Sequence, residues 1–135
     1  MQDAETLVFK ALDSDTVLIN LLGGKKTVNN CKWNRIYNSK IALNPDEYPR
    51  VTIYEVLNED AVYGDNNPQC SDVNIRIDLW TKDQSIIFDI CKQIKQTLLN
   101  SFEICEVKLE SKMFEEDTEV HHKPINVYLL LEQGE

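Results

Sequence analysis

The sequence lacks the short motifs that mark the common classes of enzyme. It contains only four glycines, and they form neither a Gly-x-Gly-x-x-Gly nor a Gly-x-x-x-x-Gly-Lys-Ser/Thr phosphate-binding loop. The zinc-binding pattern His-Glu-x-x-His and the Gly-x-Ser-x-Gly turn of serine hydrolases are also missing. These absences argue against a kinase, another nucleotide-dependent enzyme or a hydrolase of common type. We therefore expect a protein without catalytic activity and without a cofactor.

Basic residues are also in short supply. The chain of 135 residues has 14 Lys and Arg against 23 Asp and Glu, which gives a formal net charge of −9. A nucleic-acid-binding protein needs a basic stripe to displace counterions from phosphates, and no such stripe is visible. We expect that the protein repels DNA rather than binding it, and that it does not bind an anionic membrane surface.

Long apolar runs and zinc-type cysteine pairs are missing as well. No run approaches the roughly 18 residues that a membrane-spanning helix needs. The first residues lack the basic and apolar regions of a signal peptide, so we expect a soluble protein made in the cytoplasm. The four cysteines contain no Cys-x2-Cys half-site. They are interpreted as reduced thiols rather than as zinc ligands or a disulfide: Cys31, Cys70, Cys91 and Cys105.

Helical signals come at the start of the chain and in its second half. With 42% hydrophobic residues, the chain has enough apolar material for one domain over residues 1–135. Apolar residues at helical spacing predict helices over 3–12 and 16–22, with Asp3 and Asp15 as N-caps and Gly23-Gly24 as the end of the second. Together they predict a helical hairpin. A longer amphipathic helix is predicted over 84–100, with this apolar stripe: Ile87, Ile90, Cys91, Ile94 and Leu98.

Strand signals occupy most of the rest. Residues 50–57 are rich in β-branched and aromatic side chains, and residues 73–80 alternate between apolar and polar. Two further strands are predicted over 104–114 and 125–131, the first with Val107, Leu109, Ser111 and Met113 on one face. A short strand within 33–37 and a loop over 38–48 complete the chain. The predicted fold is α+β, with an antiparallel or mixed sheet of about four to five strands and the helices on one face.

A polar stretch over residues 58–72 separates two of the predicted strands. It contains Gly64, Asn66, Asn67 and Pro68, and most hairpin loops are far shorter. A loop of this length either has a function or is disordered, and the sequence leaves both alternatives open.

The second half of the chain holds one pattern that suits metal chemistry. Residues 106–108 and 110–112 both read Glu-x-Lys, as in metal-dependent nucleases, and Asp78 could be the upstream acid. Alternating charges on a solvent-facing strand give the same pattern without any function. Because a chain of charge −9 would also repel DNA, a Mg²⁺-dependent nuclease is the less favoured alternative.

Two other groups of polar residues have ordinary explanations. His121 and His122 are adjacent, so on a strand they point to opposite faces and cannot easily share one metal. With Glu119 they could make a weak metal site, but metal ligands need convergent geometry and a second shell. We interpret them as exposed polar residues of a hairpin. The acidic run over 115–119 lacks the spaced ligands of a calcium loop, and we interpret it as a solvated turn.

Three segments occur in an order that is typical of one family. The opening helix is followed by ALDSDTVL at residues 11–18, the first long strand begins YPRVTI at 48–53, and VNIRIDLWT at 73–81 precedes the amphipathic helix that ends at Leu98-Leu99. In these segments, over about residues 7–100, the chain resembles the tail-completion, or head–tail joining, proteins of siphophages and their prophages.

This resemblance implies a structural role in a virion. Family members are α+β subunits that form a ring, typically of six, on the last ring of the tail tube, stop its growth and dock on the head connector. The implied partners are other copies of the chain, the tail tube protein and the connector or stopper protein, first in the host cytoplasm and then in the tail. DNA would pass an acidic lumen without specific binding. The alternatives are another small head–tail adaptor and a soluble binding module.

Five residues are predicted to make the contacts of such a ring. Arg76, Asp78 and Trp80 lie on the polar face of the strand over 73–80, and Tyr63 with Asp65 lies in the stretch over 58–72. Trp80 places a large aromatic side chain where water would normally be. It could equally cover the edge of the core. A closed ring needs heterologous side-to-side contacts, which such residues could supply.

Overall fold

The computed structural model describes residues 3–23, 26–28, 31–33, 36–37, 48–64 and 67–132. The helices are α1 (Ala4–Asp13), α2 (Thr16–Leu21) and α3 (Ile87–Ser101), and a single 3-10 turn, η1 (Gln84–Ile86), leads into α3. The strands are β1 (Lys26–Val28), β2 (Cys31–Trp33), β3 (Ile36–Tyr37), β4 (Arg50–Gly64), β5 (Asn67–Thr81), β6 (Cys105–Leu109), β7 (Met113–Glu115) and β8 (Val120–Glu132).

One main sheet organises the fold. Within the described residues it has six strands in the order β3-β4-β5-β8-β6, and β7 also pairs with β8. Only β3 is parallel to its neighbour; the other pairings are antiparallel. β1 and β2 form a separate two-stranded sheet. The predicted α+β fold with a mixed sheet is confirmed, and the sheet is larger than the sequence indicated.

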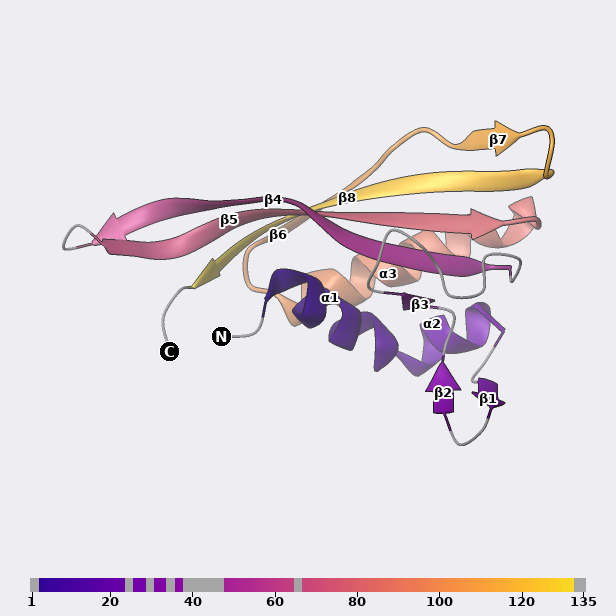
Figure 1. The fold of residues 1–135 in the computed structure, drawn as a ribbon, viewed down its shortest axis with the longest axis horizontal. Coiled ribbons are helices and arrows are strands. Elements are labelled where there is room, and N and C mark those ends of the chain that lie inside the picture. Colours follow the sequence, from indigo (N-terminus) through magenta and orange to yellow (C-terminus); the bar gives the residue numbers. More distant parts are fainter. Residues whose placement is uncertain are drawn as a thin grey trace.

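The three helices lie on one side of this sheet (Figure 1). The alternation of β5 explains the arrangement, because Ile75, Ile77 and Leu79 are fully buried and face the helices. The predicted stripe of α3 packs against them, with Ile90, Ile94 and Leu98 fully buried in the same core. Burial of each such side chain stabilises the fold by about 1.5–3 kcal/mol relative to leaving the side chain exposed.

Both N-terminal helices begin at the predicted caps. The Asp3 carboxylate accepts a hydrogen bond from the backbone N–H of Thr6 at 2.9 Å, and Asp15 accepts from the N–H groups of the first turn of α2. Asp15 also accepts hydrogen bonds from the side chains of Gln93, at 2.8 Å, and Thr97 of α3. Burial alone would raise the pKa of Asp15, but the bonds from Thr97, Gln93 and the helix N–H groups hold it below the usual 3.8.

The prediction of a long loop over 58–72 is wrong. Residues up to Gly64 continue β4 and residues from Asn67 continue β5, so the two strands form a long hairpin with a two-residue connection. Register shifts near Val56 and Val62 interrupt the pairing, which is typical of β-bulges. The outer half of this hairpin, residues 58–64 and 67–72, is called the arm here. The arm extends past the helices in Figure 1. No helix of the described residues covers it.

The predicted strand over 104–114 is in fact two strands. β6 ends at Leu109 and β7 starts at Met113, and both pair along the same edge of β8. The apolar face was only partly right: Val107 is buried, but Leu109 and Met113 are more than 40% exposed. The acidic run forms an exposed turn, as predicted, in which Glu119 has a left-handed φ of 60°.

Two further expectations concern membranes and cysteines. No helix of the described residues is long and apolar enough to cross a membrane. Cys70, Cys91 and Cys105 are not joined in disulfides, and burial raises the pKa of Cys91 to about 11. The side chain of Cys31 and residues 38–47 of the loop predicted over 38–48 lie outside the described residues. The prediction of one short strand within 33–37 is only partly right, because Trp33 ends β2 in the two-stranded sheet, whereas Ile36 and Tyr37 form β3 in the main sheet.

Candidate interaction surface

The sheet surface opposite the helices carries a polar cluster. We call this surface the open face, and its central residues come from three adjacent strands: Thr52 of β4, Arg76, Asp78 and Trp80 of β5, and His122 and Asn126 of β8. The antiparallel register places Trp80 opposite His122 and Arg76 opposite Asn126. Residues directly opposite in a ladder have side chains within contact distance, so the cluster follows from the pairing of the strands.

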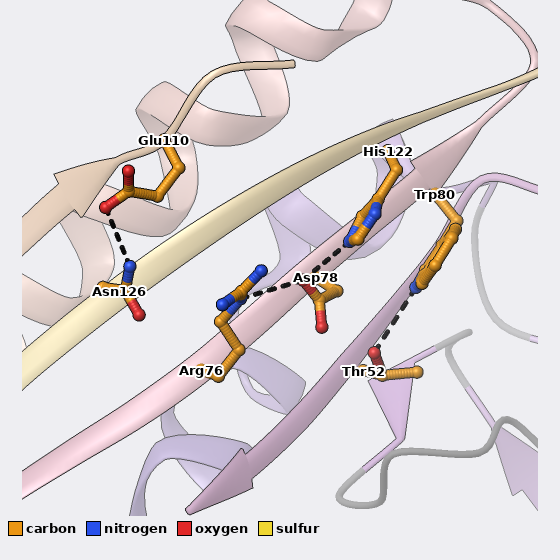
Figure 2. Close-up of polar contacts among 7 residues, drawn as sticks. All are labelled: Thr52, Arg76, Asp78, Trp80, Glu110, His122 and Asn126. Atoms are coloured by element: carbon orange, nitrogen blue, oxygen red, sulfur yellow. Dashed lines mark hydrogen bonds and ion pairs between the residues drawn. The ribbon is translucent and has the colours of Figure 1, made fainter. Parts of the chain in front are cut away.

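Asp78 lies at the centre of the cluster (Figure 2). Its Oδ1 atom is 3.1 Å from Nε of Arg76 and 2.7 Å from Nε2 of His122. A carboxylate only accepts hydrogen bonds, so Nε2 of His122 carries the proton in this contact. Asp78 is 6% exposed, although no helix lies above it. On this polar face of β5, Asp78 is thus covered by its contacts with the side chains of Arg76 and His122.

Trp80 extends the cluster toward β4. Its ring stacks on the imidazole of His122, with a centroid distance of 3.8 Å and an angle of 8° between the planes. The guanidinium of Arg50 lies 5.3 Å from the Trp80 ring and 4.6 Å from the ring of Tyr48, within the range of cation–π contacts. The indole N–H of Trp80 points to the hydroxyl of Thr52 at 3.5 Å (Figure 2). Trp80 thus packs on the open face and is half-buried there.

The other end of the open face is charged. Asn126 donates a hydrogen bond to Glu110 at 2.9 Å (Figure 2), and Lys108 of β6 pairs with Asn126 in the ladder. Glu110 is thus tied to an amide, while Asp78 is tied to Arg76 and His122. Among the described residues, no group of three His, Cys, Asp or Glu side chains could hold a metal ion.

The five predicted contact residues do not form one patch. Arg76, Asp78 and Trp80 lie together on the open face. Tyr63 lies in the arm and pairs with Pro68, twelve residues before Trp80 in β5, which at the rise of a strand is roughly 40 Å away. Asp65 lies outside the described residues. There are thus two separate candidate surfaces, the open face and the arm.

Sequence reasoning missed the contribution of β8 to the open face. His122 was interpreted as an exposed hairpin residue, but it lies inside β8 with its side chain 14% exposed, between Asp78 and Trp80. His121 faces the other side of the strand, against the ring of Phe114. The adjacent histidines do point to opposite faces. Only the register of β8 on β5 reveals the role of His122, and no local pattern carries that information.

Comparison with known proteins gives a likeness of fold. No family model matches the sequence, and no curated protein matches it. Among solved structures, the chain matches a chain of the virion of a native gene transfer agent particle, with a TM-score of 0.61 at 10% sequence identity. The match covers 96% of this chain and 95% of that one. The two proteins therefore share a fold over almost their whole lengths.

Proposed function

We propose that this protein is a non-catalytic structural subunit of a phage-type virion. In the finer form of the proposal, it closes the head-proximal end of the tail tube and joins the tail to the head connector. The observation that carries the proposal is the fold shared with a chain of a gene transfer agent virion, because the likeness extends over 96% and 95% of the two chains. The resemblance of residues 48–53 and 73–81 to tail-completion proteins supports the finer role.

The open face suits a contact with another subunit. It presents Trp80 with its ring stacked on His122 and in cation–π contact with Arg50, so the aromatic ring is held in one orientation before any partner binds. Rigid Trp and Arg side chains surrounded by polar groups are typical of the energetic centres of interfaces. We propose that neighbouring copies in a ring, typically of six, or the adjacent tail tube protein, cover this face.

The arm is the second contact surface in this proposal. It extends past the helices (Figure 1), and Val56 and Leu57 at its base are about half exposed. A long hairpin that reaches beyond the core can contact a subunit that the core itself does not touch. The carboxylates of residues 58–72 would line the lumen, where like charges let DNA slide without lasting contacts.

Light scattering across a concentration series, with negative-stain images of the same samples, tests the proposal. We expect closed rings with a central hole. Trp80→Ala should reduce the fraction of rings while circular dichroism shows an unchanged fold, because it removes the central aromatic of the open face. Leu99→Ala is the matched control, since Leu99 is 45% exposed on the outer side of α3. If the protein stays monomeric at every concentration, both alone in solution and when mixed with tail tubes, the result would instead favour an adaptor or a soluble binding module.

A further inference from the structure

A groove of about 470 Å³ lies on the helix side of the molecule, between the start of α3 and the edge of the sheet at β6 and β8. Its apolar wall includes Ile87, Phe88 and Leu109. Phe88 is 73% exposed and Leu109 is 42% exposed. Exposed apolar side chains that gather in a hollow, rather than singly, indicate a place where another molecule packs.

Lysines surround this apolar wall. Lys92 and Lys95 come from α3, Lys112 from the segment after β6, and Lys123 from β8. The whole chain has only 14 Lys and Arg and a net charge of −9, so four lysines around one groove are a local reversal of the overall charge. None of the four forms an ion pair with another described residue. The groove therefore suits an acidic segment that also carries an apolar side chain.

The chain itself contains a segment of that kind. Met113 and Phe114 of β7 are about half exposed, and the exposed turn that follows carries the carboxylates of Glu115, Glu116, Asp117 and Glu119. We call residues 113–119 the acidic hairpin. The ladder between β7 and β8 pairs Phe114 with His121 and Met113 with His122. This pairing holds the hairpin at the edge of the sheet, so it can fill the groove of another copy but not its own.

We propose that two copies of this chain pair reciprocally, each placing its acidic hairpin in the lysine-rimmed groove of the other. The groove and the hairpin are neighbours on the surface, because Lys112 directly precedes β7 and Lys123 follows His122 in β8. A single patch that carries both complementary halves is what a two-fold contact requires. Four lysines would face four carboxylates in each half of the contact, with Phe114 or Met113 against Phe88.

This pairing goes beyond the proposed role in the tail. It uses the helix side and the β7–β8 edge, whereas the ring contacts proposed above use the open face and the arm. It also places the carboxylates of residues 115–119 in a protein contact, which leaves those of residues 58–72 for the lumen.

A charge-swap experiment tests the pairing, with sedimentation velocity at low salt as the measurement. Lys92→Glu/Lys95→Glu reverses the groove, and Glu116→Lys/Asp117→Lys reverses the hairpin; all four positions are exposed. We expect the wild-type chain to form dimers, or paired rings where the contacts of the open face form as well. Each variant alone should weaken the pairing tenfold or more, since close charge pairs in interfaces contribute at least the 1.4 kcal/mol that a tenfold change requires. An equimolar mixture of the two variants should restore the dimer, because both contacts are complementary again.

The matched control is Lys108→Glu, which reverses an exposed lysine of β6 on the open face, outside the groove. It should leave the dimer unchanged. Dimers that persist in both variants, or a mixture that stays monomeric, would overturn the pairing. A wild-type chain that never dimerises would also overturn it and would leave the groove to an acidic segment of a different protein. Rings of higher mass that form through the open face should survive both charge reversals, so the two proposals can fail separately.

Discussion

Replacing Asp78 with alanine tests whether the cluster on the open face is a fixed structural unit. Among the described residues, Asp78 is the only acceptor seen for Nε of Arg76, at 3.1 Å, and for Nε2 of His122, at 2.7 Å, and the change removes it. It leaves His122 largely buried, with its side chain 14% exposed, beside Trp80. The stack of His122 on Trp80 should then loosen, because nothing else in the described contacts holds the imidazole at that angle.

The cost can be estimated from these two bonds. A hydrogen bond to a charged group contributes about 1.5–3 kcal/mol. The bond to Arg76 belongs at the low end, because the Arg76 side chain is 28% exposed and water can replace the carboxylate. The bond to His122 is more buried and contributes more. Together they give a loss of about 3 kcal/mol in the free energy of unfolding, which for a domain of this size lowers Tm by about 10 °C.

Urea unfolding monitored by tryptophan fluorescence measures this loss. The matched control is Asp72→Ala, because Asp72 is an exposed aspartate in the same strand and should change stability by less than about 0.5 kcal/mol. Asp78→Asn keeps the shape and one acceptor oxygen, so it should recover part of the loss. Equal effects of Asp78→Ala and Asp72→Ala would refute the reasoning, since the cluster would then contribute nothing.

Four further predictions concern the helices, the acidic turn and Cys91. Asp15→Ala should lower the free energy of unfolding in urea by about 2 kcal/mol more than Asp3→Ala does. Both changes remove an N-cap, but only Asp15 also accepts hydrogen bonds from Gln93 and Thr97 of α3. Similar losses in the two variants would show that the contact between α2 and α3 does not stabilise the fold. Since the folded pKa of Asp15 lies below the usual 3.8, its contribution is present at pH 7 and should disappear as the pH falls through that folded pKa. Glu119→Gly should raise stability by about 0.5–1 kcal/mol, because glycine adopts the φ of 60° without steric cost, and a lower Tm would contradict this. Cys91 should resist maleimide at pH 7.5 until the protein unfolds, since it is 3% exposed and burial raises its pKa to about 11; mass spectrometry of native samples would detect labelling.

The parts of the fold that were predicted correctly are those set by local periodicity. The alternation of residues 73–79 fixes which side of β5 is buried, and the stripe from Ile87 to Leu98 fixes the inner side of α3. Asp3 and Asp15 mark the helix starts because a cap acts on its own first turn. Such signals need no knowledge of distant residues.

The arm and the open face depend on pairing between distant segments. Residues 58–72 lack alternation because the arm lies beyond the core, so the sequence resembles a loop although the backbone forms a ladder. The run of turn-forming residues Gly64-Asp65-Asn66-Asn67 was the available turn signal. Arg76, Asp78 and Trp80 could be placed on one face from β5 alone. His122, 44 residues after Asp78, joins them only through the register of β8.

Binding to tail tubes tests the central proposal most directly. Gold-labelled protein would be incubated with tubes assembled from the tail tube protein of the same particle and viewed by negative-stain microscopy. We predict label at one end of each tube only, and tubes that stop growing once that end is occupied. Label along the tube walls, at both ends or nowhere would contradict a role at the head-proximal end of the tail.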